Sequence, residues 1–167
     1  MTDLIILATL LPGAQHGYSL KRQAGLILGQ ENLHNNLVYP LLRRFVANRW
    51  VSKQEVPGQR GQTRQLYSLT ALGKKELILR LSTLSEQDAR DSNEFRLRVG
   101  MFQVIPPEAR LHILERRQAF LQSRLEKLSA IEKNFDLDRY AGEVTRRLLA
   151  DSEVEINWIE HLRRISK

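Results

Sequence analysis

The apolar side chains of this chain change from helical spacing to strand spacing near residue 50, and that change limits the folds it can adopt. Over residues 35–49 they recur at helical spacing, in a stripe formed by Leu37, Leu41, Leu42, Phe45 and Val46. Residues 50–56 and 64–69 then have the composition of short strands. Between them, residues 57–63 include turn-forming residues and no apolar side chain, so we expect a long hairpin with a polar, basic tip.

Further helices are predicted on both sides of this hairpin. Residues 3–11 predict a short apolar helix and residues 16–28 a second one, both before the helix that carries the stripe. After the hairpin, Thr70 is placed to cap a further helix that begins at Ala71. Three helices, a hairpin and a fourth helix are the order of a winged helix-turn-helix. We therefore predict a mainly α fold with a winged helix-turn-helix domain over residues 1–84.

The second half of the chain is predicted to be entirely helical. One helix is expected over residues 91–104 and a last one over 138–165. Between them a leucine-rich series of residues, spaced alternately three and four positions apart as in a coiled coil, continues for about four heptads. Its members are Leu111, Leu114, Gln118, Leu121, Leu125, Leu128, Glu132 and Phe135. Because two long amphipathic helices cannot cover their apolar stripes on so small a domain, residues 85–167 are predicted to be long C-terminal dimerisation helices, and the protein a homodimer.

The net charge is +7 and lies entirely in the first half. Residues 1–84 hold 11 basic and 4 acidic side chains, which leaves 15 of each sign for residues 85–167. An excess confined to one domain is typical of a protein that binds a polyanion such as nucleic acid. A basic surface that serves only solubility is the alternative interpretation of the charge.

Three motifs in the first half occur together in a known family. They are His16-Gly17-Tyr18-Ser19-Leu20, then Leu37-Val38-Tyr39-Pro40-Leu41-Leu42-Arg43-Arg44-Phe45, then Leu66-Tyr67-Ser68-Leu69-Thr70-Ala71-Leu72-Gly73. Residues 4–77 thereby resemble the PadR-like transcriptional regulators, and the Trp158-Ile159-Glu160 stretch is similar to the family's helical tail. The resemblance implies a repressor that binds a palindromic operator in double-stranded DNA as a homodimer.

Two segments depart from the family pattern. His34-Asn35-Asn36-Leu37-Val38 replaces a lead-in that often contains Ser or Pro, Gly and Thr before the second motif. Arg60-Gly61-Gln62-Thr63-Arg64 replaces a Gly-Pro-Pro-Arg run at the hairpin tip. Because the lead-in reaches the DNA groove, the bases selected here are expected to differ from those of other members.

The third predicted helix holds the residues expected to select bases. Opposite its apolar stripe lie Asn36, Tyr39, Pro40, Arg43 and Ala47. Asparagine can pair with adenine through two hydrogen bonds, and arginine with guanine. Asn35 either caps the helix or contacts DNA, and Arg44, nearer the core edge, forms either a salt bridge or a phosphate contact. Pro40 is expected within the first turns, where its missing N–H costs least.

Other basic and aromatic residues of the first half are predicted to hold the DNA backbone. Arg60 and Arg64 in the hairpin can reach phosphates or an adjacent minor groove; the alternative is a solvated loop. On the second helix, Tyr18, Lys21 and Arg22 are expected to position the protein on DNA without specifying a sequence. A half-buried Tyr18 is the alternative for that residue.

The sequence offers no candidates for several other functions. It has no cysteine, and the four histidines, of which His16 is expected to order a turn, form no metal-ligand spacing, so no metal or cofactor is expected. No triad order, phosphate loop or paired-carboxylate pocket points to an enzyme. No apolar run is long enough to cross a membrane, and the first residues differ from a signal peptide, so a cytoplasmic protein is expected.

Two alternatives remain open from the sequence. Phe102 and Trp158 either line a pocket for a small-molecule effector, which the family resemblance implies, or belong to the core, where aromatic side chains on an apolar helix face are usually found. The whole chain is either a DNA-binding regulator or a winged-helix protein-interaction module that does not bind DNA. An enzyme with an unrecognised site is a further rival.

Overall fold

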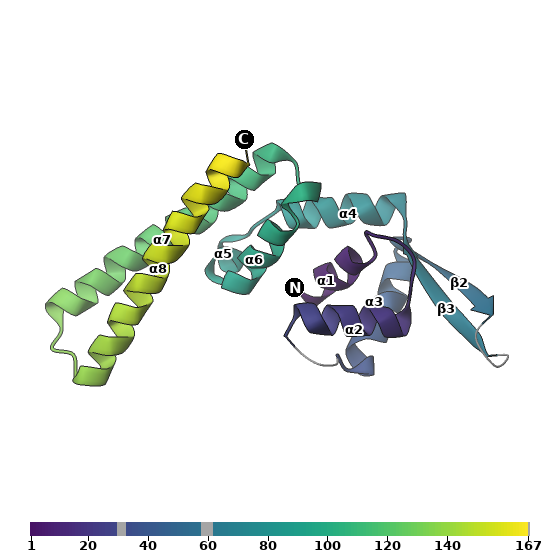
Figure 1. Ribbon diagram of the computed structural model, residues 1–167, viewed down its shortest axis with the longest axis horizontal. Helices are drawn as coiled ribbons and strands as arrows, with labels where there is room; N and C mark the ends of the chain where they lie inside the picture. Colours follow the sequence, from purple (N-terminus) through teal and green to yellow (C-terminus); the bar gives the residue numbers. More distant parts are fainter. Residues whose placement is uncertain (30–32, 58–61, 167) are drawn as a thin grey trace. The chain divides into compact units, whose positions relative to one another are not determined.

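The expected change from helices to a hairpin is present in the computed structural model, which describes residues 1–29, 33–57 and 62–166. The chain forms two compact units, Met1–Leu81 and Ser82–Lys167. The elements of the first unit, in chain order, are α1 (Thr2–Thr9), β1 (Gln15–His16), α2 (Gly17–Ile27), α3 (Asn35–Ala47), β2 (Val51–Pro57), β3 (Thr63–Leu69) and α4 (Ala71–Ser82), the last of which ends one residue beyond this unit (Figure 1). The predicted mainly α, winged-helix fold class is confirmed.

The strands form an antiparallel sheet in the order β1-β3-β2. β2 and β3 pair over their whole length, from Val51 opposite Leu69 to Pro57 opposite Thr63, and they project as a hairpin from the helices of this unit (Figure 1). The two residues of β1 add a short third strand, with Gln15 opposite Tyr67. The sheet therefore fixes the start of α2 against the last strand of the hairpin.

α1 is the buried centre of the first unit. Its side chains from Leu4 to Thr9 are all buried, so this helix is surrounded on every face. A helix that is apolar all round is stable only inside a core. α2 lies against α1, and α3 packs against β2.

A Schellman motif ends α3 and directs the chain into β2. The amide of Trp50 donates to the carbonyl oxygen of Phe45 at 2.9 Å, and the amide of Arg49 to that of Val46 at 3.0 Å. Arg49 takes the left-handed conformation, with φ at 61°, at a position where glycine is usual. The rings of Phe45 and Trp50, 5.9 Å apart, complete the motif with its hydrophobic contact.

The predicted cap of α4 is confirmed. The Thr70 hydroxyl accepts a hydrogen bond from the Gly73 amide at 3.0 Å and lies 2.7 Å from the Arg49 carbonyl oxygen, to which it donates. Gly73 is needed here, because a Cβ atom would collide with the carbonyl oxygen of Trp50. The first turn of α4 is thus held directly against the turn between α3 and β2.

Two details predicted for α3 are wrong. Leu37 is 42% exposed, and the buried stripe is Val38, Leu42 and Phe45 instead. At 100° per residue, Leu37 points far from the centre of that stripe. Pro40 is the sixth residue of α3 and thus lies within the first turns as predicted, but the expected low cost is wrong, because its missing N–H removes one backbone hydrogen bond from the helix interior.

The second unit contains α5 (Glu86–Arg90), α6 (Ser92–Gly100), the 3-10 helix η2 (Phe102–Val104), α7 (Pro107–Asn134) and α8 (Arg139–Ile165). Side chains of Ser85, Asp91 and Asp138 cap α5, α6 and α8 by accepting hydrogen bonds from backbone amides. The single helix predicted over residues 91–104 is wrong at its end, because α6 stops at Gly100. α7 and α8 lie side by side as a long antiparallel hairpin (Figure 1).

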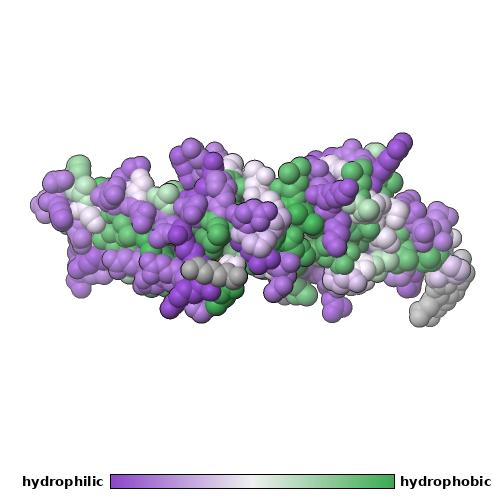
Figure 2. Space-filling model, turned by 90° about the horizontal axis from the view of Figure 1, so that it is seen from above, coloured by the Kyte–Doolittle hydropathy of each residue, from purple (hydrophilic) through white to green (hydrophobic). Residues whose placement is uncertain are grey.

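The predicted leucine seam is buried only in part. Leu114 and Leu121 lie in the core, whereas Leu111 is exposed and Phe135 lies beyond the end of α7. Hydrophobic patches remain between hydrophilic side chains on the surface of the α7–α8 hairpin (Figure 2). Over the described ranges 1–29, 33–57 and 62–166, no helix combines the length and apolarity that a membrane span requires.

Candidate nucleic-acid interface

α3 presents a polar side to solvent along its whole length. This side is lined by five exposed residues, Asn36, Tyr39, Pro40, Arg43 and Ala47. Asn36, Tyr39 and Arg43 carry polar groups, and Pro40 carries a ring, that solvent reaches. On the opposite side Val38, Leu42 and Phe45 are fully buried. An amide, a phenol and a guanidinium group are thereby held on a rigid, accessible helix face. These are side chains that can hydrogen-bond base edges or phosphates.

Tyr39 is held in place by close packing against the start of α2. A Cβ atom on Gly17 would lie 3.1 Å from Cε1 of Tyr39 and 3.4 Å from Cε2 of Tyr67. Any larger residue at position 17 would therefore require the Tyr39 ring to move back slightly. Tyr39 keeps 37% of its surface exposed, so it is anchored at one side and accessible at the other.

A groove of about 400 Å³ lies where α2, α3 and β3 meet. The side chains and backbone that line it belong to His16, Gly17, Tyr18, Ser19, Tyr39, Arg64, Gln65 and Tyr67. His16 secures this junction, since its Nδ1 lies 3.1 Å from the carbonyl oxygen of Gln65. The groove brings together Tyr18, Tyr39 and Arg64, three of the residues predicted to contact DNA.

Tyr67 lies at the buried wall of this groove. Burial raises the pKa of its phenol above the usual value of 10.0, and the nearby Tyr39 raises it further, whereas the positive charge of Arg43 partly offsets both. The Tyr67 hydroxyl is therefore neutral at physiological pH. Arg43, although exposed, lies close enough to this wall for its charge to act there.

Asn35 does not cap α3. The N-cap residue is His34, whose side chain accepts no capping hydrogen bond, and Asn35 is the first residue of the helix. The amide oxygen of Asn35 instead accepts a hydrogen bond from the ammonium group of Lys21 on α2, at 3.2 Å. Lys21 thus reaches the start of α3, which its position in the sequence does not reveal.

Most of the cations predicted to contact DNA have no acidic partner among the described residues. In the part of the chain that the structure describes, Lys21, Arg22, Arg43 and Arg64 form no ion pair. Arg44 differs, because its guanidinium lies 3.7 Å from the carboxylate of Asp3. The salt-bridge alternative therefore holds for Arg44. Arg60 lies outside the described residues.

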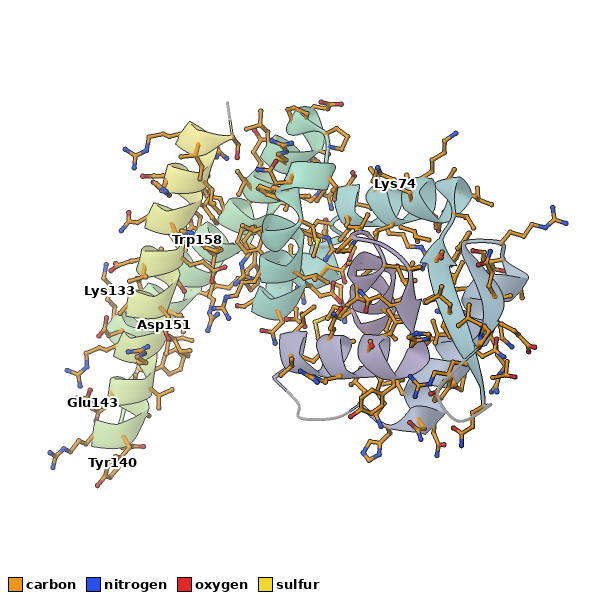
Figure 3. All side chains as sticks on the ribbon, turned by 45° about the vertical axis from the view of Figure 1, so that its right-hand side comes forward. Lys74, Lys133, Tyr140, Glu143, Asp151 and Trp158 are labelled. Carbon is orange, nitrogen blue, oxygen red and sulfur yellow. The ribbon has the colours of Figure 1, made fainter. Side chains whose placement is uncertain are left out.

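Tyr18 and the effector candidates also have defined surroundings. Tyr18 is 67% exposed, so the half-buried alternative is wrong. In the second unit, Trp158 meets Phe95 edge to face at 5.8 Å and lines a groove of about 420 Å³ with Arg96, Arg124, Arg147 and Asp151. Figure 3 places Trp158 and Asp151 along α8, with Tyr140 at the far end of the hairpin. Phe102 is buried and is not among the residues that line this groove.

Local sequence patterns do not reveal the residues that support this interface. Gly17, Gln65 and Tyr67 meet only because β1 pairs with β3, which joins segments about 50 residues apart. Gly17 is recognisable as part of a motif, but its role in making room for Tyr39 is not. Among the described residues, no group of three or more acidic or histidine side chains is arranged to bind a metal ion.

The first unit is a winged helix whose third helix, α3, exposes a polar side, and several of its cations form no ion pair among the described residues. These features define a nucleic-acid-binding class of protein. Residues 6–78 match the family model described as the transcriptional regulator PadR-like family. Residues 6–78 therefore form a domain of the PadR-like family of transcriptional regulators, the family that the three motifs predicted. Residues 93–166 match a second model, the C-terminal region of virulence activator alpha.

Several solved structures are similar to the chain. One assigned as a transcriptional regulator of Thermoplasma acidophilum is 30% identical over 46% of this chain and 72% of that one, with a TM-score of 0.43. A PadR family transcription regulator from Clostridium difficile is 24% identical over 47% of this chain and 81% of that one, with a TM-score of 0.41. Bacillus subtilis PadR, in complex with operator DNA, is 19% identical over 99% of this chain and 98% of that one, with a TM-score of 0.44. No curated protein matches the chain.

Proposed function

We propose that this regulator, rather than being an enzyme, binds double-stranded DNA sequence-specifically as a homodimer, at a palindromic operator, and represses transcription in the cytoplasm. α3 is the recognition helix, and residues 1–84 are the DNA-binding domain. The observation that carries the proposal is the division of α3 into a buried side and an exposed side with Asn36, Tyr39 and Arg43. Such a helix can enter a major groove and offer hydrogen-bonding side chains to base edges.

Each predicted contact has a role in this proposal. Asn35, Asn36, Tyr39 and Arg43 lie on α3 and contact bases or the adjacent backbone. The cations of α2 and of the β2–β3 hairpin, with Tyr18, hold phosphates. Arg44 contributes less, since Asp3 already neutralises part of its charge. The contribution of Arg60 stays a prediction from the sequence.

Residues 85–167 are the dimerisation region in this proposal. Apolar side chains stay exposed along α7 and α8, among them Leu111, Val144, Val154 and Ile165. A second copy of the same surface would remove them from water. Sedimentation of the full chain is expected to give twice the mass of 19.4 kDa, and a monomer at micromolar concentration would contradict this part of the proposal.

We assign a small-molecule effector to the groove beside Trp158, which replaces the predicted pair Phe102 and Trp158. Three arginines, two carboxylates and an aromatic ring line this groove. Because Asp151 pairs with Arg147 and Glu155 with Arg117, the charges of Arg96 and Arg124 remain to favour a ligand with an anionic group and an apolar part. The chain has two tryptophans, so Trp50→Phe leaves Trp158 as the sole tryptophan reporter of fluorescence. A ligand that weakens operator binding without changing this fluorescence would place the effector elsewhere.

The central test is a selection of sites from random DNA duplexes with the full chain. We expect one palindromic site, and Arg43→Ala is expected to lose the preference at one base position per half-site, worth about 1–3 kcal/mol. The matched control is Arg146→Ala, an exposed arginine of α8, which should leave the selected site unchanged. Identical sites for wild type and Arg43→Ala would contradict the role of α3. Failure to bind any duplex, specific or not, would favour the protein-interaction module.

A further inference from the structure

α8 carries one buried and one exposed stripe of side chains. The buried stripe includes Thr145, Ser152 and Ile159 and lies on the side of α8 that packs within the second unit. The other, which we call the α8 stripe, follows steps of four and three residues, which keep side chains in one line along a helix. Its members are Tyr140, Val144, Arg147, Asp151, Val154 and Trp158 (Figure 3). All are exposed except Trp158, which is half-buried.

The members of the α8 stripe are arranged symmetrically about Leu149. An aromatic residue stands nine positions to either side of it, a valine five positions to either side, and a charged residue two positions to either side. The two charged residues, Arg147 and Asp151, have opposite signs. A stripe with this order is complementary to a second copy of itself that runs in the opposite direction.

An antiparallel contact between two α8 helices, with a twofold axis at the level of Leu149, matches every apolar member. Each residue then faces the one that is equally far from Leu149 on the other helix. Tyr140 faces the partner's Trp158, and Val144 faces the partner's Val154. The contact would therefore remove the exposed apolar surface of Tyr140 and of both valines from water, which favours association.

The charged members are matched in the same arrangement. Arg147 faces the partner's Asp151, and by symmetry the reverse contact forms as well. Within one helix Arg147 already pairs with Asp151 at 2.8 and 3.1 Å, and both side chains remain largely exposed. The guanidinium keeps N–H donors that this pair does not use, and each carboxylate oxygen has a second lone pair. Both groups can therefore also bond across the interface.

Other arrangements of the two helices leave this stripe mismatched. A parallel pair in register places Arg147 opposite the partner's Arg147, and the two aspartates opposite each other. An antiparallel pair displaced by one heptad places Asp151 opposite the partner's Val154, or Val144 opposite the partner's Arg147. Like charges in contact are repulsive, and a charge against an apolar side chain loses hydration without compensation. A charged layer within an apolar stripe thereby fixes direction and register.

We propose that α8 pairs with α8 of a second copy of this chain, antiparallel and centred on Leu149. The proposal rests on the proposed function, which assigns dimerisation to residues 85–167 without an arrangement of the helices. It also concerns the groove beside Trp158, because four members of the α8 stripe line that groove. The groove then lies between the two subunits, and Tyr140 of the partner subunit completes its wall.

Cysteine cross-linking of the full chain tests the direction of the helices, because the chain has no cysteine of its own. Val144→Cys/Val154→Cys should form a covalent dimer on oxidation or with a short bifunctional thiol reagent. Neither single variant should do so, because its two cysteines would lie about 15 Å apart along the helices, whereas a disulfide needs Cα atoms within about 7 Å. Arg146→Cys/Glu153→Cys, at exposed positions outside the stripe, is the control and should stay unlinked.

Charge reversal tests the register independently. Arg147→Glu makes both facing positions acidic and Asp151→Lys makes both basic, so each variant alone should dimerise at least about tenfold more weakly in sedimentation. An equal mixture should regain the wild-type affinity, because an acidic helix then faces a basic one. Repulsion within a single helix would not be relieved by mixing. Arg146→Glu, at the exposed residue before Arg147, should leave the dissociation constant of the dimer unchanged.

Several results would overturn the proposal. A single cysteine variant that cross-links with itself indicates parallel helices, and a double variant that stays monomeric excludes the register. Charge variants that do not regain affinity on mixing show that Arg147 and the partner's Asp151 do not meet. If wild type is a dimer in these experiments, only this inference fails and the proposed function stands. A wild type that sediments as a monomer overturns the dimeric part of the proposed function as well.

Discussion

Arg117 on α7 donates hydrogen bonds to both carboxylate oxygens of Glu155 on α8, at 2.8 and 2.9 Å. The same guanidinium donates to the carbonyl oxygen of Ala89 in α5 and to the hydroxyl of Ser92 in α6, at 2.6 and 2.7 Å. Only 1% of Arg117 is exposed. One buried charge therefore joins four helices of the second unit, and its donors are satisfied by groups from all of its neighbours.

Removing one partner of this pair is expected to destabilise the second unit strongly. Arg117→Met leaves the Glu155 carboxylate without its partner in a site of low polarity, which costs about 3–5 kcal/mol. Urea unfolding in a Trp50→Phe background, followed by the fluorescence of Trp158, measures the loss. Arg146→Met is the control, because Arg146 pairs with Glu143 on the surface and such pairs contribute about 0–1 kcal/mol. Equal losses in the two variants would contradict the role of Arg117.

Gly73→Ala is expected to disrupt the junction of α4 with the turn after α3. The added methyl group would meet the backbone oxygen of Trp50, which cannot move aside as a side chain can. We expect a loss of about 3 kcal/mol in the free energy of unfolding of the first unit. Gly142→Ala, within α8, meets nothing closer than 3.7 Å and should gain up to about 1 kcal/mol from helix propensity. Denaturant unfolding of both variants measures these changes.

Arg49→Gly is expected to stabilise the first unit. Arg49 has a positive φ of 61°, which costs an L residue about 1 kcal/mol and costs glycine nothing. The midpoint of denaturant unfolding should therefore rise. Asn48→Gly is the neighbouring control: its φ of −78° suits any residue, so glycine there only adds freedom to the unfolded chain and should lower stability. A lower midpoint for Arg49→Gly would refute this explanation of the turn.

Alkaline pH is expected to destabilise the first unit through Tyr67. Burial raises the pKa of Tyr67 in the folded protein, whereas in the unfolded chain the phenol ionises near 10.0. The unfolded state therefore loses its proton first as pH rises, and stability that is fully present below pH 10 is lost above it. Tyr67→Phe should remove this part of the decline in unfolding free energy between about pH 9 and 12. Tyr18→Phe, at an exposed phenol, should not.

Salt dependence tests the electrostatic part of DNA binding. If a dimer neutralises about six to ten phosphates, log K against log salt concentration should fall with a slope of roughly −5 to −9. Equilibrium binding of the full chain to its selected duplex at several salt concentrations measures this slope. Arg64→Gln should make it less steep by about one for each phosphate that the variant leaves without a cation. A slope near zero would leave the unpaired cations of the first unit without a role.

The sequence predicted the elements whose signals are local. α3 begins at the predicted residue, and the cap at Thr70 follows from its place before a helix. The surroundings of Arg117 could not be predicted in this way, because a charged side chain on a helix is usually solvated. Its burial depends on oxygen atoms from α5, α6 and α8, up to 38 residues away in the chain.

The candidate interface was predictable in its residue types but not in its contacts. The spacing of Asn36, Tyr39 and Arg43 opposite an apolar stripe indicated an exposed face, which the structure has. The predicted stripe is wrong at Leu37, because apolar character alone does not tell which residues of a helix face the core. The packing of Tyr39 against Gly17, and the hydrogen bond from Lys21 to Asn35, depend on how α2 and α3 meet in space.

Pro40 has a consequence for how α3 can adapt. Without an amide hydrogen at residue 40, the carbonyl oxygen of Asn36 lacks its usual helical donor. The opening turn of the helix, which carries both asparagines, is thus tethered to the remainder by one bond fewer, and His34 adds no side-chain cap to tighten it. That turn is therefore held by fewer bonds than the part from Val38 to Phe45, whose apolar side chains are anchored in the core. In the proposed complex with DNA, this less constrained turn carries the two asparagines.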